Sequence, residues 1–244
     1  MKATASILLA IVSTLVALPG WSRDPKYPAF DEFLMAPAEE IALAKSAAPA
    51  SIADRATIKV LTRSGYEVAS KGDNGFVCLV MRGWSAVAFT PTDGHKLAYD
   101  TKIQAPICYD QVASRTILLV EEMRARLGLQ GMEPDAIPQE IAMAYALGKL
   151  PKMESVSFAY MWSAGQNLGP DGKWHPHMMI YAPYYKSAML GGFRGDSGLP
   201  AVAVDDGTPF ALVVVAVDES LAVKPKIPAS STPGADRGGH AGLH

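Results

Sequence analysis

Cysteine is scarce in this chain, whose 244 residues include only Cys78 and Cys108. A single pair with this wide spacing excludes a CxxC redox centre, and no second pair is present to build a zinc site. In a reducing cytosol the two would be buried thiols, whereas in an exported chain an even pair predicts a disulfide. Export therefore implies a structural bond between Cys78 and Cys108.

Long apolar runs are missing too, except at the N-terminus. After Lys2, residues 3–18 are uncharged and mostly apolar, and a Pro-Gly pair ends the run. Small residues follow where a signal peptidase would cleave, so residues 1–22 are predicted to be a signal peptide. The alternative is an uncleaved anchor, which the marginal length of the run disfavours. We expect a periplasmic or secreted mature chain without a transmembrane segment.

Neither acidic nor basic side chains cluster strongly in the sequence. The 22 basic and 24 acidic side chains give a formal net charge of −2 without a basic patch. This distribution disfavours nucleic acid as a partner, because phosphate binding requires clustered lysine and arginine. Acidic residues stand in pairs on predicted helices, and we expect these pairs on solvated faces: Glu39 and Glu40, and Glu121 and Glu122.

Residue patterns predict strands first, then two helices, then further strands. Helix chemistry marks residues 37–47. Three β-rich runs separated by turn signals predict an antiparallel meander over 56–62, 65–70 and 75–84. Residues 85–107 look irregular.

The second half of the chain begins with two predicted helices, from Asp110 to Leu127 and from Pro138 to Gly148. Strands are expected at 155–163 and from near His177 to just before Pro183, and a final hairpin at 199–204 and 209–217. This order predicts the α+β class, with a single domain over 23–223, a mainly antiparallel sheet and two or three helices. Residues 224–244 are rich in Pro, Gly and Ser and are expected to be a disordered tail.

The stretch "KWHPHMMIYAP" places two histidines one residue apart. Residues two apart in a strand share a face, so four side chains are predicted to point the same way: His175, His177, Met179 and Tyr181. The alternate residues, Met178 and Ile180, are expected to enter the core. Together with Trp162 of the preceding strand, the histidine face is the predicted ligand-binding site, comprising Trp162, His175, His177 and Tyr181.

Two imidazoles on one face can also hold zinc or copper, and His175 and His177 are the expected metal ligands. A third ligand is not evident, because His95 would have to fold back and His240 and His244 lie in the expected tail. The alternative is a strand whose histidines hydrogen-bond to loop carbonyls.

The stretch "GDSGLP" resembles the nucleophile loop of trypsin-like serine proteases, with Ser197 in the position of the nucleophile. The order His95, Asp100 or Asp110, then Ser197 matches that family. Three features oppose a protease: the surroundings of His95, Leu199 in place of a glycine, and helices in the middle of the chain. A glycine-rich surface loop is the simpler interpretation.

Three segments together resemble a family of exported bacterial proteins to which no activity is attached: "NGFVCLVMRGW", "YMWSAGQNLG" and "WHPHMMIYAP". The family segments fall here on residues 74–80, 106–108, 160–163 and 174–179. The resemblance implies export, supports the Cys78–Cys108 pairing and makes the His-Pro-His strand a family feature. Family members often have an acidic residue where Met81 stands, which disfavours an enzyme that needs that acid.

The leading hypothesis is an exported domain that binds a ligand or a partner, with no catalytic residue assigned. The chain contains no P-loop, dinucleotide fingerprint, HExxH or GxSxG motif. A metal-assisted hydrolase using His175 and His177 is the alternative, and a serine hydrolase using Ser197 is less favoured.

Overall fold

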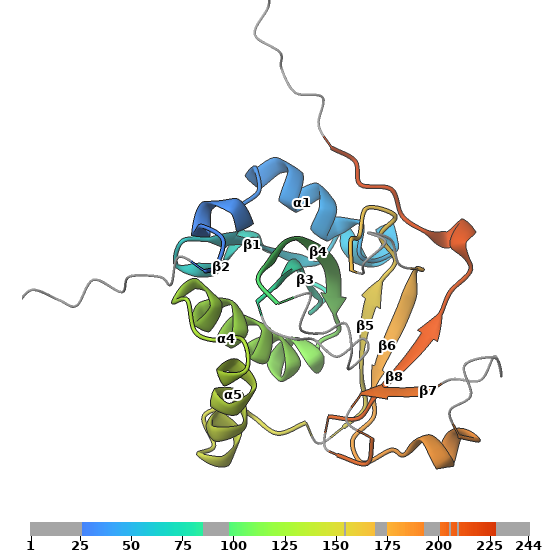
Figure 1. Ribbon diagram of the computed structural model, residues 1–244. Coiled ribbons are helices and arrows are strands. Elements are labelled where there is room, and N and C mark those ends of the chain that lie inside the picture. Colours follow the sequence, from blue (N-terminus) through green and yellow to red (C-terminus); the bar gives the residue numbers. More distant parts are fainter. Residues whose placement is uncertain are drawn as a thin grey trace, which may run out of the picture.

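The computed structural model describes residues 26–84, 98–153, 155–168, 175–192, 201–204, 206–208 and 210–227. In this part of the chain eight strands form one sheet in the order β2-β1-β3-β4-β5-β6-β8-β7 (Figure 1). The strands are β1 Thr57–Thr62, β2 Gly65–Ser70, β3 Val77–Gly83, β4 Asp100–Tyr109, β5 Ser157–Met161, β6 His177–Tyr181, β7 Ala201–Val204 and β8 Leu212–Ala216. Neighbouring strands pair antiparallel except β1 and β3, which are parallel.

The described helices lie mostly between and before the strands rather than alternating with them. They are α1 Pro37–Lys45, α2 Ala50–Ala53, α4 Ile117–Leu129 and α5 Ala136–Ala146, with 3-10 turns η1 Phe30–Phe33, η2 Ala113–Arg115, η3 Ser187–Leu190 and η4 Glu219–Leu221. The predicted helices at 37–47 and 138–148 are confirmed as α1 and α5. The predicted α+β class is confirmed as well.

The helix predicted from Asp110 is confirmed only in its second part. The Asp110 carboxylate accepts hydrogen bonds from the backbone N–H groups of Val112 (2.9 Å) and Ala113 (2.7 Å). It therefore caps a chain turn as expected, but that turn is the 3-10 turn η2. The α-helix α4 begins later, at Ile117.

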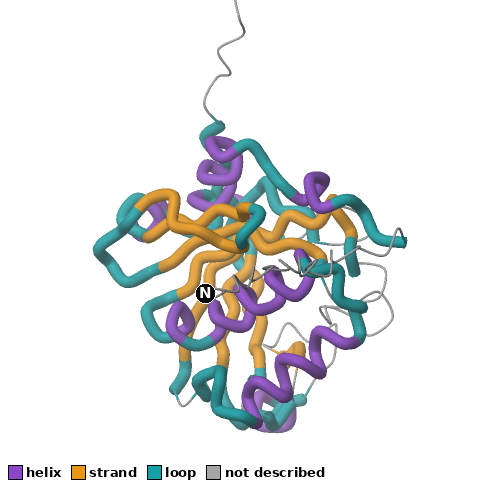
Figure 2. Tube along the Cα trace, turned by 90° about the vertical axis from the view of Figure 1, so that its left-hand side faces the viewer, coloured by secondary structure: helices purple, strands orange, loops and turns teal. Residues whose placement is uncertain are grey.

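Different helices cover the two faces of the sheet (Figures 1 and 2). On the face that we call the α1 face, Cys78, Val80 and Cys108 pack against Leu43 and Ala44 of α1. On the opposite face, the α4 face, strands β3 to β6 pack against the start of α4, through Leu79, Ile107, Tyr109, Ala159, Met179, Ile117 and Leu118. In Figure 1, strands β5, β6 and β8 extend away from these helices.

The first three strands do not form the predicted meander. β1 and β2 make the expected hairpin, but β3 lies on the other side of β1. The loop 71–76 passes against the start of β1, where Gly72 N–H donates to Thr57 Oγ1 (3.0 Å) and Asp73 N–H to the Arg55 carbonyl (2.9 Å). A Cβ on Gly72 would lie 2.1 Å from the Arg55 oxygen, so this close passage requires glycine.

Residues 85–107 were predicted to be irregular, and this is wrong for the part that forms β4. Residues 85–97 lie outside the described residues. Pro106 obscured the strand pattern, because proline lacks the N–H that a ladder uses. In the described sheet β5 pairs with β4 at Cys108 and Tyr109 and does not extend to Pro106. The missing N–H therefore costs no hydrogen bond to β5.

Two carboxylates predicted on solvated faces are buried, Glu40 fully and Glu121 with 9% exposed. Glu40 Oε1 lies 2.9 Å from an Arg82 guanidinium nitrogen and accepts the Leu61 N–H (3.1 Å). Burial raises the Glu40 pKa, and the Arg82 charge opposes that rise. Glu121 Oε1 accepts a hydrogen bond from Arg124 (2.7 Å). The buried Glu40–Arg82 pair ties α1 to β3.

Candidate functional site

The histidine strand lies where the sequence predicts it. β6 pairs antiparallel with β5, with Ser157 opposite Tyr181 and Met161 opposite His177. The predicted hairpin of β7 and β8 is also present. The neighbouring strands are thus confirmed, and the orientation of their faces decides which side chains are accessible.

The buried side of β6 is the opposite of the predicted one. His177, Met179 and Tyr181 are buried on the α4 face, whereas Met178 and Ile180 are partly exposed. Met178 and Ile180 were predicted to enter the core, which is wrong. His177 and Tyr181, on the histidine-bearing face of β6, therefore lie in the protein core.

The His177 ring lies in this core and contacts the backbone two residues before it. Its Nδ1 lies 2.9 Å from the His175 carbonyl oxygen. Burial lowers the pKa of the imidazole, and the contact with the His175 carbonyl opposes that change. The neutral ring is therefore the form that the fold favours.

His175, two residues earlier, is at the surface. Its Nδ1 lies 2.7 Å from Glu219 Oε1 in η4, and both side chains are about three-quarters exposed, 73% and 74%. An exposed pair of this kind contributes little to stability. Among the described residues, no group of three His, Cys, Asp or Glu side chains is placed to hold a metal ion. The two predicted metal ligands thus occupy different environments, one core and one solvent.

Trp162 lies on the other face of the sheet from His177 and Tyr181. It follows β5 in step with Tyr160, and the two rings are 5.8 Å apart. Its backbone N–H donates to the Ala47 carbonyl (2.9 Å), after α1. The four residues of the predicted ligand site therefore do not come together on one surface.

The reverse side of the same strands carries a partly exposed apolar surface, which we call the open face: Phe158, Tyr160, Met178, Ile180 and Val215. Phe158 is 37% exposed and the other four are intermediate. Strand register places Phe158 beside Ile180 and Tyr160 beside Met178. Within the described residues, Tyr160 packs against the cluster that includes α1. Ile180, Val215 and Leu190 of η3 pack against a second cluster of buried residues, Ala182, Ala211 and Val213. The surface between these contacts carries no described helix.

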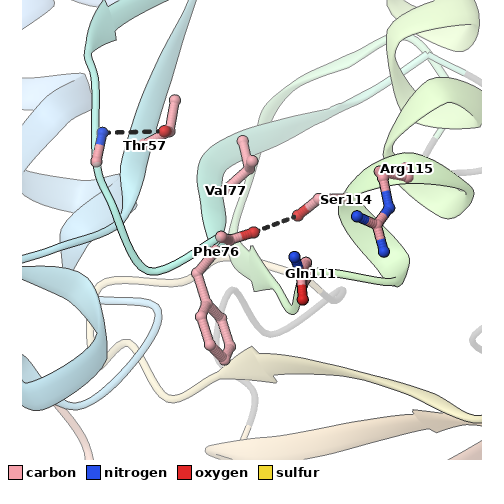
Figure 3. Close-up of a pocket in the computed structure, with 8 residues that line it drawn as sticks. Thr57, Phe76, Val77, Gln111, Ser114 and Arg115 are labelled. Carbon is pink, nitrogen blue, oxygen red and sulfur yellow. Dashed lines mark hydrogen bonds between the residues drawn. The ribbon is translucent and has the colours of Figure 1, made fainter.

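A hollow of about 330 Å³ lies beside the open face, and we call it the Arg115 hollow (Figure 3). Its lining residues are Thr57, Gly72, Gly75, Phe76, Val77, Gln111, Ser114 and Arg115. Phe76 links it to the open face, because the Phe76 ring lies 6.2 Å from the Tyr160 ring. Sequence reasoning missed this hollow, and the only local signal was the glycine-rich "KGDNG" turn before the "NGFVC" segment.

The other histidines and the serine considered from the sequence lie outside the described residues. His95, Ser197, His240 and His244 belong to the part of the chain that is not described.

Both aspartates considered for a catalytic triad accept hydrogen bonds from backbone N–H groups. Asp110 also accepts the Phe158 N–H (2.9 Å), and Asp100 accepts the Lys102 N–H (2.8 Å). The described residues thus add no support for a serine-protease site.

The described helices are all too short or too polar to cross a bilayer. The chain matches no protein-family model, and no curated protein or solved structure is significantly similar to it. The resemblance to an exported bacterial family therefore stays a prediction.

Proposed function

We propose that this protein is an exported binding domain whose open face contacts a partner protein. Export rests on the N-terminal sequence pattern, and the Cys78–Cys108 disulfide supports it, because such bonds persist in oxidising compartments. The observation that carries the binding function is the row of partly exposed apolar side chains on β5, β6 and β8. Clustered exposed apolar residues mark interaction surfaces.

A protein partner fits this surface better than a small molecule. Small-molecule sites are concave and enclose the ligand, whereas the open face presents its side chains in rows on a sheet. Its content of Phe, Tyr and Met is typical of the centre of protein–protein interfaces. The open face carries no arginine or lysine, so nucleic acid is not a suitable partner.

A photoreactive phenylalanine analogue at position 158 tests the proposal in the exporting cell. We expect one discrete cross-linked product from position 158. We expect none from the same analogue at Val68, which is 49% exposed on the edge strand β2, away from the open face. Ile180→Glu introduces a charge beside Phe158 and should abolish the product while the fold is retained.

Cross-linking from position 158 that equals that from position 68, or that persists in Ile180→Glu, would contradict a specific interface. A product with twice the mass of the chain would identify the partner as a second copy. The melting temperature of each variant controls for loss of the fold.

A further inference from the structure

We infer that the Arg115 hollow is a binding site for a carboxylate group. This inference does not depend on the open face having a partner. It rests on three features of the hollow: rigid walls, unpaired hydrogen-bond donors and a local charge that suits a single negative charge.

The first wall is the loop 72–77, which is fixed by its own contacts. Arg55 and Asp73 form a double hydrogen bond (2.9 and 3.1 Å). Asn74 Nδ2 donates to the Ile52 carbonyl (2.8 Å), and its Oδ1 accepts the Phe76 N–H (3.0 Å). A loop held in this way is preorganised, so binding a ligand does not require it to become ordered.

The second wall is η2, which the Asp110 carboxylate caps. Ser114 Oγ donates to the Asp110 carbonyl (2.6 Å) and lies 3.5 Å from the Gly75 carbonyl oxygen, which joins the two walls. Gly75 keeps the space between them open, because a Cβ there would lie 3.1 Å from Gln111 Cγ. Its φ of +79° also favours glycine.

Side-chain donors line this space at η2 and at the start of β1. The side chains of Gln111 and Arg115 are exposed, and within the described part of the chain neither side chain has an ion-pair or hydrogen-bond partner. They stand on the η2 side of the hollow, and Thr57, Phe76 and Val77 stand on the strand side (Figure 3). The Thr57 hydroxyl accepts the Gly72 N–H, so its own proton is free to donate.

The charges around the hollow favour a single negative charge. Among the lining residues Arg115 is the one cation, and Arg55 at the edge of the loop is neutralised by Asp73. A planar carboxylate matches the fork of one guanidinium with two parallel hydrogen bonds. A doubly charged phosphate would find no second cation among the lining residues. Phe76 and Val77 supply apolar contact for the body of the ligand.

The carboxylate could belong to a small free acid or to an acidic side chain of a bound protein, because both present the same group. Benzoate is a suitable probe, since it joins a carboxylate to a flat apolar ring. In a titration followed by amide NMR shifts of the mature protein, we expect saturable changes at Gly72, Gly75 and Ser114. Benzamide, which has the same shape without the charge, should not produce them.

Arg115→Gln should weaken benzoate binding about tenfold or more, since it removes the charged hydrogen-bond pair. Arg126→Gln is the matched control, because Arg126 is an exposed arginine of α4 away from the hollow. Its affinity should equal that of the unmodified chain. Phenylphosphonate should bind more weakly than benzoate.

Equal affinity in Arg115→Gln, tighter binding of phenylphosphonate, or the absence of saturable shifts would overturn the inference. A glutamate-containing peptide compared with its glutamine counterpart separates the two sources of the carboxylate. Saturation by the glutamate peptide indicates a protein partner, and saturation by benzoate alone indicates a free acid. Ile180→Glu should leave benzoate binding unchanged, so failure of the open-face proposal would not affect this test.

Discussion

Cys78 and Cys108 stand directly opposite each other on β3 and β4, bonded, with their Cα atoms 3.9 Å apart. The bond closes a loop with a sequence separation of 30 and is buried where α1 packs on the sheet. Replacing both cysteines by alanine should lower the free energy of unfolding by about 3–4 kcal/mol, mainly by freeing the unfolded chain. Urea denaturation measures the difference. Two titratable thiols in the native protein from an oxidising compartment would contradict this prediction.

Glu40→Gln should destabilise the protein by about 3–5 kcal/mol, because it leaves the Arg82 charge buried without a counter-charge. Both side chains of this pair are only 1% exposed. The exposed pair Arg55–Asp73, at 65% and 69%, provides the comparison. Asp73→Asn should cost less than about 1 kcal/mol, since exposed ion pairs contribute little. Similar losses in the two variants would show that burial does not control the effect.

Gly72→Ala should lower the free energy of unfolding by about 1–3 kcal/mol or more, as expected for overpacking. The added Cβ would meet backbone atoms of Arg55 and Ala56 at 2.1 and 2.3 Å, and backbone cannot move aside as a side chain can. Lys71→Ala at the neighbouring exposed position is the control and should be nearly neutral. An unchanged denaturation midpoint for Gly72→Ala would mean that the loop does not pass β1 this closely.

Elements with strong local signals were predictable from sequence. Pro37 in the first turn and Glu39 after it indicate the start of α1, and alternating residues mark β5 and β6. The position of β3 was not predictable, because it depends on how the loop at Gly72 crosses β1. Successive strands usually pair as hairpins. Here the contact of the loop at Gly72 with the start of β1 places β3 beside β1 instead of beside β2.

The orientation of β5 and β6 could not be predicted from either strand alone. Ala159 is small, which suggests an outer face, yet it lies between Tyr109 of β4 and Met179 of β6. These large neighbours fill the core and leave room for only a small side chain between them. Alternation separates two faces, but tertiary packing decides which one is buried. The open face was missed for this reason.

Metal analysis should find no stoichiometric zinc or copper held by His175 and His177. His177 is in the core and His175 is at the surface beside Glu219, so the two rings do not share a coordination sphere. Elemental analysis of protein purified from its native compartment measures the content. One metal ion per chain that is lost in His175→Ala would contradict the prediction and would support the hypothesis of a metal-assisted hydrolase.

Acid should destabilise the protein in part through His177. Burial lowers the pKa of this imidazole from its ordinary value of 6.5, so the folded state favours the neutral ring and the unfolded chain binds the proton more readily. The stabilisation from this group is fully present above pH 6.5 and is lost as the pH falls through the folded-state pKa. Between these two pH values it contributes a slope of about 1.4 kcal/mol per pH unit.

His177→Asn keeps a donor near the position of Nδ1 and removes the titration. In urea denaturation from pH 7.5 to 4.5, the unfolding free energy of this variant should fall less steeply than that of the unmodified chain. His175→Asn is the matched control, because it makes the same substitution at the surface, two residues from the core position. If both variants follow the same curve as the unmodified chain, His177 accepts its proton in the folded state and the ring is not held neutral by burial.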